Sequence, residues 1–145
     1  MINISRRLVL AFVFCALAGW PALAHAQAQA VRVDPKPLGA SDPQAQRAAV
    51  LVKQLLAGDK AAALKTLRTE GEESFAKKSD LEQIVDAQIA RLGKAKYTIS
   101  SFETGLGADV VVLLDAKGAE STNIVVRFND AKKIVGFAQV QIDRG

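Results

Sequence analysis

The side chains best suited to catalysis and metal binding stand at the very start of this sequence. Its single Cys15 and single His25 lie in the same short stretch as its single Trp20. Residues 27–145 therefore contain no imidazole and no thiol. Without these groups, that segment cannot form a zinc or copper site of the usual ligands, a Ser-His-Asp or Cys-His nucleophile, a disulfide or a thiol redox centre. Its chemistry is limited to carboxylates, amines, guanidiniums, hydroxyls and one Tyr.

The other polar clusters do not have the spacing of a cofactor or metal site. The Gly-Leu-Gly segment at 105–107 lacks the third glycine and the following helix of a phosphate-binding loop, so we interpret it as a turn. The acidic residues of segment 70–73 lack the spacing of a calcium loop. We therefore expect no metal and no cofactor. Arg127 stands between apolar strand residues, where it either extends from the sheet surface or binds an anion or a partner carboxylate.

The charge pattern does not indicate a nucleic-acid partner. The chain has 19 basic and 15 acidic residues, which give a formal net charge of +4. These basic residues are scattered among acids and do not gather into a stripe.

The N-terminal segment has the three parts of an export signal. Arg6 and Arg7 precede an uninterrupted apolar run over residues 8–20, and Pro21 and a run of small residues follow. The motif Ala24-His25-Ala26 predicts cleavage after Ala26, and cleavage before His25 is the alternative. We therefore predict a signal peptide over residues 1–26 and a periplasmic or secreted protein.

Three other destinations fit this leader less well. The run 8–20 is shorter than the roughly 20 apolar residues that span a bilayer, so we expect no stable membrane insertion after cleavage. Cys15 lacks the small preceding residues of a lipoprotein signal. The arginine pair also fits a twin-arginine signal, although the general secretory route is favoured because two basic residues suffice for it. The leader resembles that of a Gram-negative periplasmic protein.

Beyond the leader, the sequence predicts a flexible linker over residues 27–43 and a single domain over residues 44–145. The linker contains Ala-Gln repeats and several prolines, and it has few side chains that could form a core. Ser41 and Gln44 then have the spacing of a capping box, after which apolar residues recur at helical spacing up to Gly58.

Two more helices are predicted after the first. Asp59 is a candidate N-cap for a helix over Lys60–Arg68. Residues 69–78 are polar and are interpreted as a loop or single turn anchored by Phe75. Ser79 and Glu82 form a second capping box, and an apolar stripe over 81–92 then predicts a third helix that ends at Gly93.

The hydrophobic period changes from about 3.6 to about 2 after Gly93. Four strands are predicted, over residues 97–104, 109–115, 122–128 and 134–142. Their short connections favour an antiparallel meander. Helices followed by strands predict the α+β class, with three N-terminal helices packed on a curved four-stranded sheet.

Both faces of this predicted sheet carry apolar residues. Ile124, Val126 and Phe128 share one face, which we expect the helices to cover. The other face is expected to present a ligand or partner surface, formed by Val111, Leu113, Val125, Arg127, Val135 and Phe137. Two explanations stay open: β-branched residues are favoured in any central strand, or the face binds a partner, most simply as a homodimer packed sheet to sheet. A small apolar ligand or an envelope protein would fit the same face.

The order of elements resembles the cone-shaped ketosteroid-isomerase-like superfold, also called nuclear-transport-factor-like or cystatin-like. The resemblance covers about residues 45–142, and its local carriers are segments 48–67 and 124–137 with the helix ending Leu92-Gly93. It implies that an acid-base residue, when the protein is an enzyme, is an Asp, His or Tyr inside the cone. The candidates here are Asp86 and Tyr97, for which the alternatives are a solvated helix position and an aromatic at the core edge.

The sequence thus predicts a small exported domain that works by binding a ligand or another protein, without catalysis. One alternative is an isomerase or hydrolase of the ketosteroid-isomerase-like kind that uses a pocket carboxylate. Another is an accessory or inhibitor subunit of an envelope enzyme. The superfold hosts all of these activities, so fold alone does not choose between them.

Overall fold

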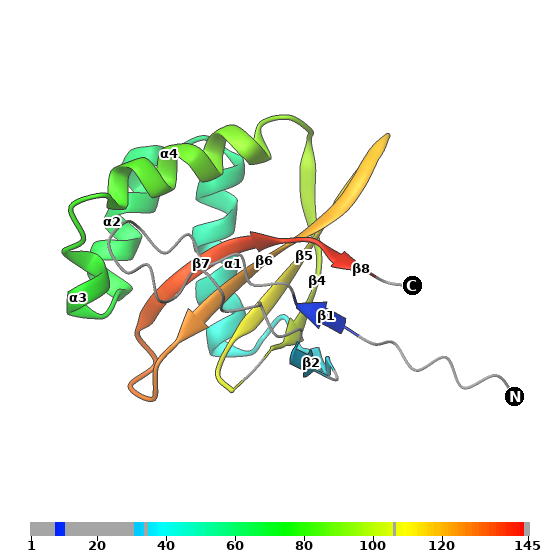
Figure 1. Cartoon of the computed structure of the whole chain (residues 1–145), viewed down its shortest axis with the longest axis horizontal. Coiled ribbons are helices and arrows are strands. Elements are labelled where there is room, and N and C mark those ends of the chain that lie inside the picture. The colour runs from blue at the N-terminus through cyan, green and yellow to red at the C-terminus, as the bar shows by residue number, and fades with distance from the viewer. Residues whose placement is uncertain (1–7, 11–30, 34, 106, 144–145) are drawn as a thin grey trace, which may run out of the picture.

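The computed structural model describes residues 8–10, 31–33, 35–105 and 107–143. Within these ranges the chain is an α+β protein, with four helices lying on one face of a five-stranded antiparallel sheet of order β3-β4-β5-β6-β7 (Figure 1). The helices are α1 (Pro43–Leu56), α2 (Lys60–Glu70), α3 (Glu73–Ala76) and α4 (Leu81–Leu92). The strands of this sheet are β3 (Pro37–Leu38), β4 (Tyr97–Thr104), β5 (Val110–Ala116), β6 (Ala119–Phe128) and β7 (Ile134–Val140).

Local signals set the start and end of α1. Its N-cap is Asp42, whose Oδ1 accepts hydrogen bonds from the backbone N–H groups of Gln44 and Ala45 at 2.9 and 3.0 Å. The predicted capping box at Ser41 is therefore wrong by one residue, because the Asp42 carboxylate takes the free N–H groups of the first turn. Gly58, with φ of +69°, follows the helix and allows the chain to reverse into α2.

The remaining helices follow the predicted pattern with small differences. Asp59 caps α2 by accepting from Ala62 N at 3.0 Å, as expected. The predicted single turn is α3, which buries Phe75. For α4 the predicted box at Ser79 is wrong: Asp80 occupies the N-cap position, and its side chain makes no capping hydrogen bond.

The five-stranded sheet corrects the prediction of four strands. The added strand is β3, which lies within the predicted linker and pairs with the end of β4 in the register Leu38↔Phe102. A two-residue strand has no hydrophobic period to detect, and Pro37 is tolerated because β3 is an edge strand. The four predicted strands are all present, with ends that differ by a few residues.

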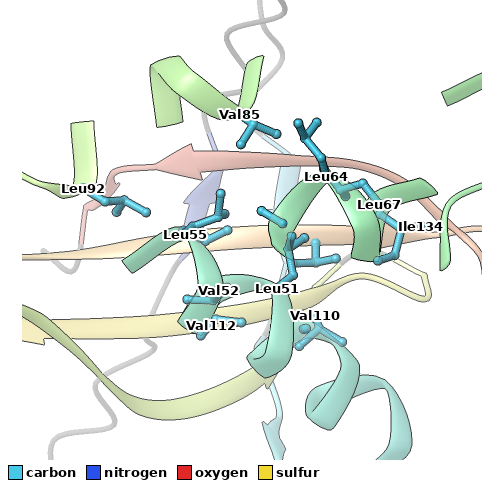
Figure 2. Close-up of a cluster of buried hydrophobic side chains, with 14 of the residues drawn as sticks. Leu51, Val52, Leu55, Leu64, Leu67, Val85, Leu92, Val110, Val112 and Ile134 are labelled. Atoms are coloured by element: carbon cyan, nitrogen blue, oxygen red, sulfur yellow. The ribbon is translucent and has the colours of Figure 1, made fainter. Parts of the chain in front are cut away.

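The core lies between the helices and the sheet. Figure 2 shows side chains from α1, α2 and α4 meeting those of β5 and the start of β7, among them Leu51, Leu67 and Val112. Every second residue of β5 points toward the helices, namely Val110, Val112 and Leu114. The same holds in β6 for Ile124, Val126 and Phe128. The expectation that the helices cover this face of β6 is confirmed.

A second, small sheet has the order β2-β1-β8. Its strands are β1 (Leu8–Leu10), β2 (Val31–Val33) and β8 (Ile142–Asp143), and β1 is antiparallel to both neighbours. They lie side by side, with β1 between the other two (Figure 1). Thus Leu8–Leu10, which belong to the predicted leader, form a strand, whereas the predicted cleavage motif lies outside the described residues.

Candidate functional site

The face of the five-stranded sheet opposite the helices forms the candidate site, and we call it the distal face. Strand register defines it: Val111 pairs with Val125, and Leu113 pairs with Asn123. These residues alternate with the core-facing residues of the same two strands, so they point away from the helices. Asp109, just before β5, and Arg127, in β6, lie at one end of this face.

The apolar residues of the distal face are buried although they do not belong to the core formed with the helices. Val111 is 0% exposed, Val125 2% and Leu113 5%. The described core cluster includes their neighbours Val110, Val112, Ile124 and Val126 but none of these three. Both faces of the central strands are therefore shielded from water.

A buried carboxylate marks one end of the distal face. Asp109 is 5% exposed, and its Oδ2 lies 3.4 Å from Nε of Arg127, whose side chain is 44% exposed. Burial raises the pKa of Asp109 above its ordinary value, while the nearby Arg127 guanidinium opposes this rise. Within the described part of the chain, this Oδ2 accepts no hydrogen bond of standard geometry.

The turn before β5 brings Asp109 into this position. The backbone N–H of Gly105 donates to the carbonyl oxygen of Asp109 at 2.9 Å. A Cβ at Gly105 would lie 3.0 Å from Cβ of Asp109, so a larger residue would push the aspartate away. A turn lies at Gly107 and Ala108, and the glycine at 105 permits this close approach.

A register shift in β7 affects two residues that the sequence assigned to the distal face. Phe137 faces the helices and meets Phe75 edge to face, with ring centroids 6.5 Å apart and planes at 86°. The register between β6 and β7 shifts between the pairs Arg127↔Gly136 and Phe128↔Ile134, which leaves Val135 unpaired in a β-bulge. This extra residue reverses the alternation, so Phe137 and Val135 do not join Val125 and Arg127 as a continuous surface.

The two catalytic candidates, Asp86 and Tyr97, form hydrogen bonds with different partners. Asp86 lies on α4, where its Oδ2 is 2.8 Å from Nζ of Lys60 and its side chain is 55% exposed. Tyr97 lies at the edge of the core, and its hydroxyl donates to the carbonyl oxygen of Glu120 at 3.4 Å. Both match the alternatives stated above, a solvated helix position and a core-edge aromatic.

Two open hollows lie on the helix side of the molecule. One lies near α3 and the turn between β6 and β7, where Lys77, Lys78 and Lys133 contribute to its lining. The other lies between α1 and α2 and includes Arg47, which pairs with Glu70. Neither hollow includes Asp109.

The described ranges contain neither a cluster of metal ligands nor a membrane-spanning helix. No group of three or more His, Cys, Asp or Glu side chains is placed there to hold a metal ion. None of the helices in those ranges is long and apolar enough to cross a membrane.

Asp109 is the residue that sequence reasoning missed. The sequence does carry a signal for it: Asp109 is a charged residue that directly precedes the apolar run 110–114 and follows Gly107 by two positions. Its contact with Arg127 depends on β6 lying alongside β5, a pairing that the local sequence does not indicate.

Comparisons with protein-family models, with curated proteins and with solved structures give no match to this chain. The site must therefore be interpreted from its own geometry. That geometry is a buried apolar patch on two central strands, ended by an aspartate and arginine pair.

Proposed function

We propose that this chain is an exported domain that acts by binding another polypeptide through the distal face, without catalysis. The observation that carries the proposal is that Val111, Leu113 and Val125 are shielded without belonging to the helix-side core. An antiparallel sheet with one solvated face would alternate apolar and polar residues in its central strands. Here β5 is apolar on both faces from Val110 to Leu114, so its second face must also be shielded from water.

Export is part of this proposal. The basic residues, apolar run and small-residue motif of segment 1–26 support a leader that is removed by the general secretory route. Removal after Ala26 leaves a chain without imidazole or thiol, which favours binding over acid-base or nucleophilic chemistry.

The likeness to the ketosteroid-isomerase-like cone is likewise a proposal. It is supported by the order of elements, helices first and then an antiparallel sheet, and by β-bulges in all three hairpin pairings from β4 to β7. Bulges increase strand bending, which a cone-shaped sheet needs.

Native mass spectrometry of the protein recovered from its own periplasm tests the proposed function. We expect a mass that begins at Gln27, together with a bound polypeptide or a second copy of the chain. A homodimer packed through the distal face and a complex with an envelope protein both support the proposal. A chain beginning at Met1, or a bare monomer at every concentration, would contradict it.

The enzyme alternative has one observation in its favour, the buried Asp109 with its raised pKa. If the recovered protein retains a small molecule, turnover of that molecule by the wild type but not by Asp109→Asn would establish catalysis. Retention without turnover would identify a small-ligand binder.

A further inference from the structure

The short strands β1, β2 and β8 form a small sheet, and two of them adjoin the edge strands of the larger sheet in the sequence. β2 is followed by edge strand β3, and Lys36 between them accepts a hydrogen bond from Thr104 N at 2.8 Å. β8 follows the opposite edge strand, β7, after a single residue. The small sheet is therefore connected to both edges of the five-stranded sheet.

Strand spacing fixes where the small sheet must lie. The edges β3 and β7 are four strand spacings apart, roughly 20 Å, whereas β2 and β8 are separated by β1 alone, about 10 Å. Both tails must therefore turn inward over one face of the larger sheet. Because the helices occupy the other face, the distal face is the one that the tails are left to cross, and Val111, Leu113 and Val125 are buried there.

The strand β1 links the two tails. Val9 pairs with Arg32 of β2 on one side and with Asp143 of β8 on the other. Without β1, both tails would have unpaired backbone groups along the edges that now face β1, and nothing would join them across the distal face.

We infer that β2 and β8 form a slot for one extended apolar strand, and that the mature domain binds its polypeptide partner by accepting such a strand. Within the full chain, the Leu-Val-Leu segment of β1 occupies the slot, so the precursor covers its own binding surface. Removal of the leader takes β1 away and opens the slot. The partner strand then runs antiparallel to both tails, and backbone hydrogen bonds supply affinity while the distal face selects apolar side chains.

This inference rests on the proposed function, because an uncleaved leader would keep the slot filled. It also makes a claim about the full chain that holds without cleavage. In full-length protein made by cell-free synthesis without membranes, we expect the backbone amides of residues 31–33 and 142–143 to be protected from hydrogen exchange. Val9→Pro removes a strand N–H between β2 and β8 and should abolish that protection. Equal exchange in the wild type and Val9→Pro would overturn the inference whatever happens to the leader.

The processed protein provides the binding test. The probe is a labelled peptide with the sequence of residues 5–13, and the readout is fluorescence anisotropy together with hydrogen exchange. We expect saturable binding that restores protection at residues 31–33 and 142–143. The peptide carrying Val9→Pro should bind about 10-fold more weakly, since it loses ladder hydrogen bonds. Absence of binding, or equal binding of both peptides, would overturn the proposed slot.

Two protein variants test whether the peptide binds at the distal face or nonspecifically to the protein surface. Val125→Asp places a charge on the distal face and should weaken peptide binding about 10-fold or more. Val50→Asp, at a residue of α1 that is 49% exposed, should leave binding unchanged. Equal loss in both variants would contradict the assignment of the peptide to this face. The intact mass of the processed protein reports leader removal separately, so failure of export and failure of the slot are distinguishable.

Discussion

Nε of Arg127 lies 3.4 Å from Oδ2 of Asp109, and this contact joins an exposed cation to a buried carboxylate. Burial raises the pKa of Asp109 in spite of the arginine. The folded state therefore holds the Asp109 proton more tightly than the unfolded chain does. Its contribution to the free energy of unfolding is fully present below the ordinary pKa of 3.8 and is lost as the pH rises through the higher folded pKa.

Asp109→Asn removes this pH dependence. We expect the free energy of unfolding of the variant, relative to the wild type, to increase as the pH rises from about 3 to neutrality, because Asn cannot ionise. Urea denaturation at several pH values measures the difference. Parallel stability curves for the two proteins would show that Asp109 titrates normally.

Glu72→Gln is the matched control, because its effect on the free energy of unfolding should depend on pH in the opposite direction. Hydrogen bonds from the hydroxyl and backbone N–H of Ser74 lower the pKa of Glu72, so its contribution to stability is lost as the pH falls. The wild type should exceed Glu72→Gln in stability near neutrality and lose that advantage in acid. A difference that grows in acid would contradict the assigned hydrogen bonds.

Neighbouring residues of β6 test the two faces of the sheet. Val126→Asp places a carboxylate in the helix-side core and should cost more than about 3 kcal/mol of unfolding free energy. In the processed protein, Val125→Asp should cost less than about 1 kcal/mol, because without β1 nothing joins the two tails across the distal face. Circular dichroism during urea unfolding measures both. Comparable destabilisation would mean that the distal face stays buried after processing.

Asp86→Asn tests whether the acidic residue of α4 has a structural role. The side chains of Asp86 and its partner Lys60 are 55% and 39% exposed. Exposed ion pairs of this kind contribute about 1 kcal/mol or less and are weakened by salt. We expect a correspondingly small loss of stability that shrinks in 1 M salt. A larger, salt-insensitive loss would indicate a buried role that the structure does not show.

The helices were largely predictable because their signals are local. Asp59 and the apolar stripe of α4 act within a few residues along the chain, and both are found as expected. The cap of α1 shifted by one residue because Ser41 and Asp42 both fit the pattern, and only the backbone at Asp42 aims its side chain at the free N–H groups.

The distal face was only partly predictable because it depends on pairing between distant segments. Val111, Leu113 and Val125 follow simple alternation and were placed together correctly. Phe137 was misplaced because one extra residue in β7 reverses the alternation, and such a bulge has no local sequence signal. Asp109 was missed because its contact with Arg127 depends on the pairing of β5 with β6.

Two adjacent residues of α1, one buried and one exposed, test which side of this helix faces the core. Leu51 points into the cluster between helices and sheet (Figure 2). It is 0% exposed, whereas Val50 is 49% exposed. Leu51→Ala should cost about 2–5 kcal/mol of unfolding free energy through lost burial and a residual cavity. Val50→Ala should change it by less than about 0.5 kcal/mol. Similar costs at both positions would place α1 in a different orientation.

Lys132, in the turn between β6 and β7, has a strained backbone conformation that a glycine would relieve. Lys132 has a φ of +58°, a left-handed conformation that costs a non-glycine residue about 1–2 kcal/mol. The backbone N–H of Lys132 donates to the carbonyl oxygen of Asn129 at 2.8 Å, and Lys133 N donates back to the Asn129 side chain, so these bonds fix the turn. Lys132→Gly should therefore raise the free energy of unfolding by about 0.5–1 kcal/mol, because glycine adopts positive φ freely. Lys133→Gly, outside the left-handed region, should lower it, since there glycine only adds freedom to the unfolded chain. Urea denaturation of the two variants compares them directly, and equal effects would show that the strain at Lys132 does not limit stability.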